Sequence, residues 1–295
     1  MKNFKYILVL FISFPAFMVA QTVLTLEEAI SITLENNFDI RIAKNELQID
    51  QENVSIGNAG MLPRVNGVVT NNNTILKTKQ TQANGNEIEI DGAKNLNLNT
   101  GVGLEWTIFD GFRMFARYNQ LKEIQKLGET ELKLNVLTKV SEVYDTYFIL
   151  VNQQHLIRSL DSIIVVSEFR LKTAQTRFTI GKASKLEVLN AEVDYNADVS
   201  AKIRLNEQYA ISKIALNQLL VRPSDTDFSV TDVILIDETL KLNDLLSLAQ
   251  EQNPELQLQY INKKIQEYEL KQVKAARYPS LSLSTGYNLI RQESP

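Results

Sequence analysis

The sequence predicts a mainly α-helical protein that also contains long β-strands. Eleven glycines and six prolines are few for 295 residues, so turns are scarce and the helices and strands are long. Through most of 136–178, apolar residues recur every three or four positions, which is the spacing of a coiled-coil helix. In two shorter stretches, 96–108 and 281–289, they alternate with polar residues, as in strands that cover one apolar face.

The composition excludes most catalytic chemistry. The chain has no cysteine, which rules out disulfide frameworks, thiolate metal sites and cysteine nucleophiles. Its single histidine, His155, leaves little from which to build imidazole clusters or Ser-His-Asp relays, and an ordinary helical position is the simpler interpretation. Glycine-rich phosphate loops and metal-ligand spacings are also missing from the sequence. We therefore expect no enzyme, no cofactor and no metal site.

The first twenty residues have the pattern of an export signal. Lys2 and Lys5 precede an apolar run from Tyr6 to Val19 that closes on Ala20, which is typical of a cleaved signal peptide. The alternative is a membrane anchor, but a run of about 14 residues falls short of the roughly 20 that a spanning helix needs. The mature chain would start at Gln21, carry a net negative charge and offer no basic surface to nucleic acid.

An internal repeat relates residues 24–65 to 240–281 at a constant, ungapped offset of 216 residues. Both segments end in a proline followed by a strand-like pattern, at Pro63 and Pro279. A constant offset favours duplication over two unrelated amphipathic helices. The second repeat is then cut short at Pro295, and we expect the full-length protein to carry the rest of it.

Two helices are expected in the first segment, 21–62. Thr25 and Glu28 form a capping-box pattern that opens a short helix to about Asn36. Asn37 breaks it, and a second helix runs over about 39–59, before Pro63. The matching helices lie in 222–278, where Pro254 suits the first turn of a helix.

The first hairpin is expected over 63–109. The strand at 96–108 is about 13 residues long, longer than a usual strand and sufficient to cross a bilayer at a tilt. A less regular strand covers about 64–77, and the polar stretch 80–92 predicts an exposed loop. Trp106 near a strand end suggests a membrane-interface anchor, with core packing as the alternative. The segment 279–295 starts a second hairpin.

Long helices are expected over 110–221. Asp110 is a candidate N-cap, and a helix over about 112–178 would measure roughly 100 Å. Gly181 ends it, and Ser184 with Glu187 forms a second capping-box pattern that opens a returning helix to about Val221. Two apolar stripes predict helix partners on both sides. The first begins Leu137, Val140, Tyr144, Tyr147 and Val151, and the second is Val136, Val140, Val143, Tyr147 and Leu150.

Together these motifs resemble the TolC-like outer membrane efflux proteins, the outer membrane factor family. The resemblance covers 22–295 and rests on the duplicated LTLEEA entry helix, the WTIFDGF turn at 106–112 and RFTIGKASKLEVLNAE at 177–192. It implies a trimer in which four strands per full protomer form a twelve-stranded transmembrane β-barrel and the long helices form a periplasmic α-barrel. A trimer also meets a physical need, because four strands cannot close a barrel and open sheet edges are unfavourable in lipid.

The resemblance also implies site residues. Phe109, Asp110 and Gly111 would mark the strand-to-helix turn. Ile180, Gly181, Lys182 and Ala183 would form the tip that contacts a periplasmic adaptor. Glu187 and Asn190 fall where relatives carry paired acids of a tip gate, although Asn190 departs from that pattern and a capping-box role is the favoured interpretation of Glu187.

The implied function is that of a passive exit duct in the outer membrane of a Gram-negative bacterium. Its partners would be two further copies of the chain, outer membrane lipid, a periplasmic adaptor (membrane fusion) protein and an inner-membrane transporter of an efflux or type I secretion system. A non-channel periplasmic coiled-coil structural protein or adhesin is the alternative, and a hydrolase of exported substrates is a third. The long alternating strands favour the channel, because a spacer needs no lipid-facing surface.

Overall fold

The computed structural model describes residues 23–231 and 241–293, which divide into two compact units. Unit 1 comprises Met1–Arg41 and Val136–Thr239, and unit 2 comprises Ile42–Asn135 and Leu240–Pro295. The predicted signal peptide lies outside the described residues. Over the described ranges, no helix combines the length and apolarity needed to cross a membrane.

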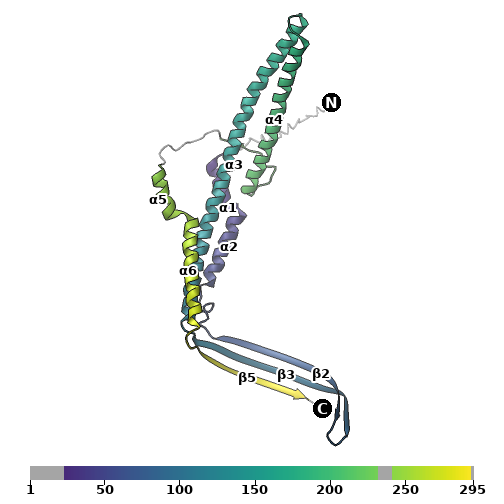
Figure 1. Ribbon diagram of the computed structural model, residues 1–295, viewed down its shortest axis with the longest axis vertical. Helices are drawn as coiled ribbons and strands as arrows, with labels where there is room; N and C mark the ends of the chain where they lie inside the picture. Colours follow the sequence, from purple (N-terminus) through teal and green to yellow (C-terminus); the bar gives the residue numbers. More distant parts are fainter. Residues whose placement is uncertain (1–22, 232–240, 294–295) are drawn as a thin grey trace, which may run out of the picture. The chain divides into compact units, whose positions relative to one another are not determined.

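The described chain is mainly helical, with two long helices and an antiparallel sheet (Figure 1). Helices α2 and α3 contribute residues to both units. In chain order the elements are β1 (Val23–Leu24), α1 (Leu26–Asn36), α2 (Phe38–Asn53), β2 (Arg64–Thr81), β3 (Glu87–Phe109), α3 (Arg113–Thr179), α4 (Lys185–Leu219), β4 (Ser229–Val230), α5 (Leu242–Gln252), α6 (Pro254–Ala275) and β5 (Leu281–Glu293).

The sequence repeat reappears in the local structure. Helices α1 and α5 both have 11 residues and start 216 positions apart, and α2 and α6 begin at the same offset. An asparagine lies between the two helices of each repeat and has the same role in both. The Asn37 side-chain oxygen accepts from the Asp39 N–H at 2.9 Å, and that of Asn253 accepts from the Glu255 N–H at 2.8 Å. Each asparagine therefore ends one helix and caps the next.

The predicted end of α2 is wrong. The helix stops at Asn53 rather than near residue 59, and a turn follows. The Ser55 hydroxyl accepts from the Asn58 N–H at 3.1 Å. Serine side chains compete in this way for backbone donors, which favours a turn over continued helix.

Strands β2, β3 and β5 form a three-stranded antiparallel sheet in that order, within unit 2. Directly opposed residues share a face, and the register places Asn66, Gly103 and Gly286 in one cross-strand row. The next row, on the other face, is Val65, Leu104 and Thr285. One face is consequently polar or side-chain-poor and the other mostly apolar, and nearly all of both is exposed.

The loop predicted over 80–92 is also wrong for most of its length. Only residues 82–86 form the hairpin turn, with Gly85 at a φ of 83°. The strands continue because opposite charges face each other across the hairpin, with Lys79 pairing with Glu87 at 2.9 Å and Lys77 with Glu89 at 3.1 Å. Cross-strand pairs of this kind let a polar sequence remain a strand.

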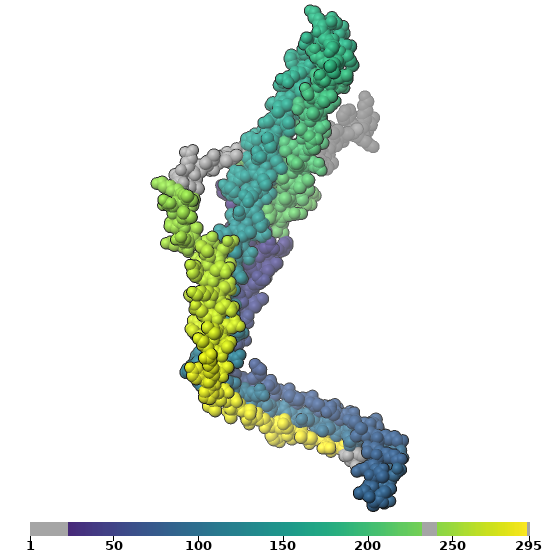
Figure 2. All heavy atoms as spheres, in the orientation of Figure 1, coloured from purple at the N-terminus to yellow at the C-terminus, as the bar shows by residue number. Residues whose placement is uncertain are grey.

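In unit 1, α3 and α4 run side by side (Figures 1 and 2), linked by an ion pair between Asp161 and Lys202 at 2.5 Å. The second predicted stripe of α3 is the buried one, since Val143, Tyr147 and Leu150 are almost fully enclosed. Leu137 and Tyr144 of the first stripe are 48% and 45% exposed. The single chain thus covers one stripe and leaves part of the other open.

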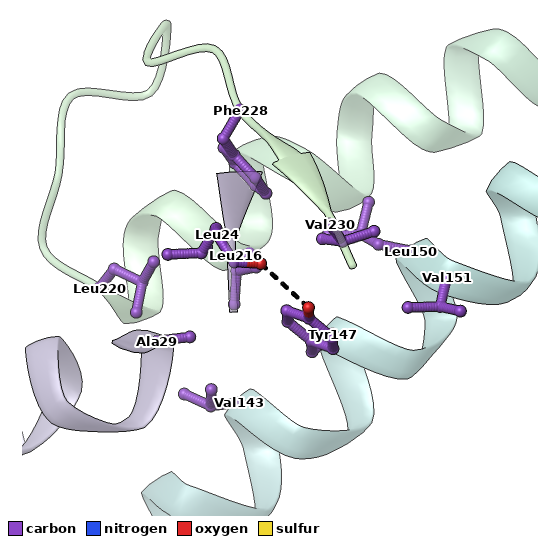
Figure 3. Packing of buried hydrophobic residues seen from close by; sticks show 10 residues of the cluster. All are labelled: Leu24, Ala29, Val143, Tyr147, Leu150, Val151, Leu216, Leu220, Phe228 and Val230. Atoms are coloured by element: carbon purple, nitrogen blue, oxygen red, sulfur yellow. Dashed lines mark hydrogen bonds between the residues drawn. The ribbon is translucent and has the colours of Figure 1, made fainter. Parts of the chain in front are cut away.

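The core of unit 1 forms around Tyr147 (Figure 3). Its hydroxyl donates to the Leu24 carbonyl at 2.9 Å, accepts from the Thr231 N–H at 3.0 Å and lies 2.6 Å from the Thr231 hydroxyl. These bonds hold α3 against β1 and the end of β4, two short parallel strands that the sequence did not predict. The cluster consists of Leu24, Ala29, Val143, Tyr147, Leu150, Val151, Leu216, Leu220, Phe228 and Val230.

In unit 2, α2 packs against α3 at Gly128. A Cβ on this glycine would lie 2.7 Å from an Asp50 carboxylate oxygen. Burial, followed by the charge of Glu46, raises the pKa of Asp50. Burial, followed by the charges of Asp50 and Glu46, raises the pKa of Glu131. The contact therefore gathers acidic groups in which burial and neighbouring negative charge disfavour the ionised forms of Asp50 and Glu131.

We expect Tyr147→Phe to lower the free energy of unfolding by about 2–3 kcal/mol, because it leaves a buried carbonyl and a part-buried N–H without the tyrosine hydroxyl as partner. Tyr144→Phe, one turn away on the exposed side, is the matched control and should change it by less than about 0.5 kcal/mol. Chemical denaturation followed by circular dichroism measures both. Equal effects of the two substitutions would show that the Tyr147 hydroxyl does not stabilise this core.

The raised carboxyl pKa values predict a pH-dependent effect of Glu131→Gln. The folded state binds more protons than the unfolded state between the ordinary and the raised pKa, so the free energy of unfolding falls as pH rises through that acidic window. At neutral pH the neutral glutamine should stabilise the protein by less than about 1 kcal/mol, given solvent screening. The gain should vanish below the ordinary glutamate pKa, near about pH 4. Melting curves from pH 4 to 7 measure this difference, with Glu52→Gln at an exposed position as the control. The same pH dependence of the melting temperature in both variants would contradict the prediction.

Candidate functional site

The candidate residues fall into two groups, each within one unit. The α3–α4 turn carries the predicted tip and gate residues in unit 1. The β3–α3 turn and Trp106 lie in unit 2.

The tip is a helix stop built on Gly181. The Lys182 N–H donates to the Arg177 carbonyl at 2.7 Å and the Gly181 N–H to the Phe178 carbonyl at 2.9 Å, which is the Schellman pattern. Gly181 has a φ of 74°, and nothing lies within 4 Å of where its Cβ would be. Glycine is needed here for its backbone conformation alone.

The tip presents apolar side chains to its surroundings. Ile180 is 60% exposed, Lys182 is exposed and Ala183 is half-buried. On the first turns of α4, Leu186 and Val193 are each 65% exposed. Apolar groups concentrated at an exposed turn are typical of a protein-binding surface.

The predicted capping box at α4 is only half present. The Ser184 hydroxyl accepts from the Glu187 N–H at 3.3 Å, but the Glu187 carboxylate pairs with Arg177 at 2.7 Å. This ion pair ties the last turn of α3 to the first turn of α4, beside a surface hollow of about 290 Å³. Asn190, one turn further along α4, is exposed.

The strand-to-helix turn depends on Gly111 for two reasons. Its φ is 70°, and a Cβ would lie 2.5 Å from the Ala275 carbonyl oxygen and 2.8 Å from the Tyr278 Cβ. Asp110 begins the helix, since its carboxylate accepts from the Met114 N–H at 3.2 Å. All three predicted residues, Phe109 included, lie at this turn.

Sequence reasoning missed Phe112, which follows Gly111. It also has a φ of 70°, and the residue is 62% exposed. A left-handed backbone is uncommon for a bulky residue. The aromatic residue gave no local signal of this conformation.

Trp106 lies on the apolar face of the sheet, opposite Leu283. Its indole N–H donates to the Met61 carbonyl at 3.0 Å, and the residue is 38% exposed. The single donor of the indole is thus satisfied within the chain, while part of the residue stays exposed.

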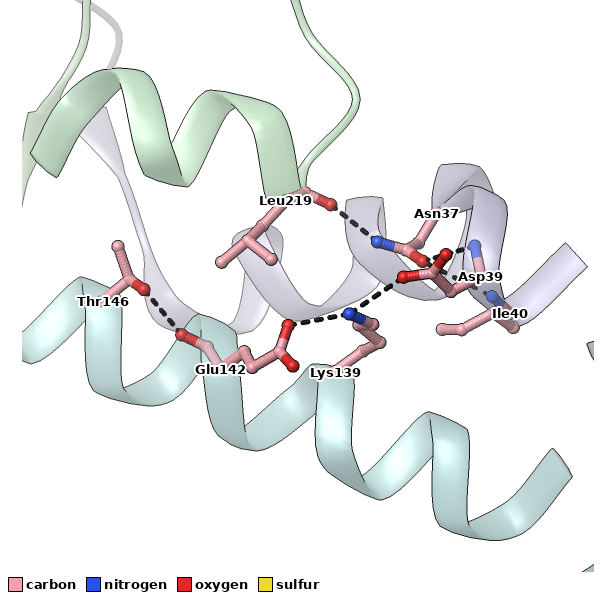
Figure 4. A network of polar contacts seen from close by, with 7 residues as sticks. All are labelled: Asn37, Asp39, Ile40, Lys139, Glu142, Thr146 and Leu219. Carbon is pink, nitrogen blue, oxygen red and sulfur yellow. Dashed lines mark hydrogen bonds and ion pairs between the residues drawn. The ribbon is translucent and has the colours of Figure 1, made fainter. Parts of the chain in front are cut away.

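A polar network in unit 1 was also missed (Figure 4). Lys139 pairs with Asp39 and with Glu142, each at 2.9 Å, and these hydrogen bonds raise the pKa of Lys139. The Asn37 amide donates to the Leu219 carbonyl at 3.2 Å. These contacts link the start of α2 to α3 and to the end of α4, beside a cavity of about 540 Å³. Within the described ranges, no cluster of three or more acidic or histidine side chains is placed to hold a metal ion.

Residues 29–221 match the family model described as outer membrane efflux protein. The chain belongs to this family. The resemblance to TolC-like outer membrane efflux proteins is confirmed, and it places the chain in the outer membrane of a Gram-negative bacterium.

Known proteins share part of this sequence or its fold. Nodulation protein T of Rhizobium leguminosarum bv. viciae is 26% identical over 184 residues, which cover 62% of this chain and 36% of that protein. The fold is similar to that of the outer membrane channel CmeC of Campylobacter jejuni, with a TM-score of 0.68 and 17% identity over 92% of this chain and 61% of that one. The outer membrane protein VceC of Vibrio cholerae has a similar fold too, with a TM-score of 0.70 and 13% identity over 92% of this chain and 68% of that one. This chain therefore spans less than two thirds of the length of CmeC.

The two turn glycines of this efflux protein should respond differently to alanine. Gly181→Ala adds only left-handed strain and should cost about 1 kcal/mol, whereas Gly111→Ala adds a clash with a backbone carbonyl and should cost more than about 3 kcal/mol. Gly181→Asn is the control, because asparagine tolerates this conformation at little cost. Thermal melting of the three variants tests the ranking. Equal losses at the two glycines would contradict the steric argument at Gly111.

Proposed function

We propose that the full-length protein is a passive exit duct of a tripartite efflux or type I secretion system. The observation that carries this proposal is the two-faced sheet β2–β3–β5, in which an exposed apolar face backs a face of asparagine, serine and glycine. The apolar face is suited to contact with lipid, and the polar face is suited to line a water-filled lumen. No catalytic step is part of this function.

A trimer supplies the closure that one chain lacks. Exposed strand edges are unfavourable in lipid, and three copies that each contribute four strands make a twelve-stranded barrel. The exposed Leu137 and Tyr144 then pack against a neighbouring copy, so that α3 lies between two partners in a periplasmic α-barrel.

The tip residues Ile180, Gly181, Lys182 and Ala183 contact the periplasmic adaptor, which connects the duct to an inner-membrane transporter. The exposed Ile180 and the rigid helix stop support this role. Glu187 and Asn190 lie at the tip constriction, where the Arg177 ion pair compensates the Glu187 charge.

The full-length protein should form trimers in outer membrane extracts and conduct ions in planar bilayers. A photo-crosslinker at Ile180 should capture the adaptor in cells, because this side chain lies at the exposed tip. The same probe at Ile211, which is 59% exposed on α4 but about 45 Å along the helices from the turn, is the matched control.

A monomer that inserts alone, or a trimer without conductance, would contradict the channel. Adaptor capture at Ile211 but not at Ile180 would contradict the tip assignment while leaving the channel intact.

A further inference from the structure

The polar face of the sheet leads into a hollow where β3 joins α3. Thr107 pairs with Ser282 and lies four residues after Gly103, so it belongs to the polar face. It also lines a hollow of about 320 Å³, within unit 2. The other side chains that line this hollow include those of Asp110, Arg113, Arg117 and Gln272. The polar face therefore continues onto a surface that carries two arginines.

The charges around this hollow do not balance. On the sheet, Arg64 lies directly opposite Glu105, so these two charges offset each other. The next three cross-strand rows on this face of the described sheet hold no charged residue. The hollow itself sets two guanidinium groups against one carboxylate, that of Asp110. Further along α3, the next acidic residue is Glu123, and it pairs with Lys126 at 2.8 Å. The hollow consequently has a net positive charge.

The two arginines are held in place by neutral groups. Arg113 and Arg117 are both exposed and lie four residues apart, on one side of α3. The Arg117 guanidinium donates to the Gln120 side-chain oxygen at 3.1 Å, and the same oxygen accepts from Gln272 at 2.8 Å. Gln120 is only 6% exposed. A buried amide therefore fixes the position of Arg117 without neutralising its charge.

We propose that Arg113 and Arg117 make the duct selective for anions, so that the exported solute carries a carboxylate or phosphate group. This inference rests on the proposed function, in which the polar face lines the lumen. A trimer then places three copies of the pair around the lumen where strands meet helices. Arginine rings select anions in pores, because surfaces with one sign of charge concentrate ions of the other sign.

The geometry suits a solute that passes and is released. Guanidinium groups hold carboxylates and phosphates through paired hydrogen bonds, and Gln120 occupies only part of the Arg117 fork. Both arginines are exposed, so salt limits their attraction to roughly 8 Å. Conduction needs binding that favours entry but remains weak enough for exit. Exposed arginines on the wall of a lumen meet both conditions.

A single thiol beside the arginines reports the local potential. The 295 residues contain no cysteine, so Thr107→Cys in a full-length protein free of other cysteines is a unique site. The protein is reconstituted in vesicles and treated with anionic or cationic methanethiosulfonate reagents. We expect the anionic reagent to be favoured, and the double change Arg113→Gln and Arg117→Gln should lower the ratio of the two rates on the order of tenfold. Arg113→Lys with Arg117→Lys keeps both charges and should retain the ratio.

Two other positions serve as controls. Thr70 lies on the same polar face, opposite Asn99 and eight residues along β3 from Thr107, which is about 27 Å. Because this exceeds the Debye length, the ratio at Thr70→Cys should not respond to the arginine substitutions. Tyr287 is 71% exposed on the apolar face, opposite Val102. Tyr287→Cys should react with neither reagent, because lipid covers it in the proposed barrel.

The outcomes separate this inference from the proposed function. An unchanged ratio at Thr107→Cys after removal of the arginines, with Tyr287→Cys protected, would overturn the arginine pair and leave the channel standing. Equal loss at Thr107→Cys and Thr70→Cys would mean that the substitutions altered the whole lumen, which also overturns the inference. Reaction at Tyr287→Cys as fast as at Thr107→Cys would overturn the assignment of the two faces and the channel with it.

The reversal potential across planar bilayers in a potassium chloride gradient tests selection of the solute. We expect the full-length protein to favour chloride, and the double change to glutamine should lower the ratio of chloride to potassium permeability on the order of tenfold. Glu187→Gln, which removes a carboxylate at the tip instead, should not lower it. A preference for potassium in the unchanged protein, or a permeability ratio that ignores the arginines, would overturn anion selection.

Discussion

The change from strand to helix at Gly111 and Phe112 is the constraint on which unit 2 depends. Two consecutive residues with φ near 70° turn the chain from β3 into α3, and the Ala275 carbonyl leaves no room for a side chain at the first of them. The same contact brings the end of α6 against the turn, just before β5 begins. The contact at Gly111 therefore lies where the paired strands β3 and β5 adjoin their helices.

Duplication repeats the local structure but not the packing. Asn37 and Asn253 end and cap helices in the same way because this depends on a few neighbouring residues. Helix α1 buries Ala29 in the core around Tyr147 and also buries Thr33, whereas none of the described residues of its counterpart α5 is buried. An amphipathic helix needs a partner that its own repeat pattern does not specify.

Features that depend on short-range chemistry were predictable, and features that depend on distant partners were not. Heptad spacing, the Thr25 cap and the Gly181 stop are each written in a few adjacent residues. The β1–β4 pair is joined to α3 by the hydroxyl of Tyr147, which lies 84 residues before Thr231 in the sequence. Periodicity gives no sign of such a contact. The stretch over 80–92 is polar like a loop, and only knowledge of the register shows that its charges pair. Glu187 meets Arg177 for the same reason, since the turn that joins them must form first.

At the tip, Arg177 stabilises the turn through both its backbone and its side chain. The Arg177 carbonyl accepts the hydrogen bond that closes α3, while its guanidinium holds Glu187 on α4. Both helices are thus fixed before any partner arrives, and the exposed Ile180 and Leu186 lie on backbone that is already ordered. Ordering a loop on binding would subtract from affinity. In the proposed function, this pre-formed turn and its exposed apolar side chains let an adaptor bind without the cost of ordering a loop.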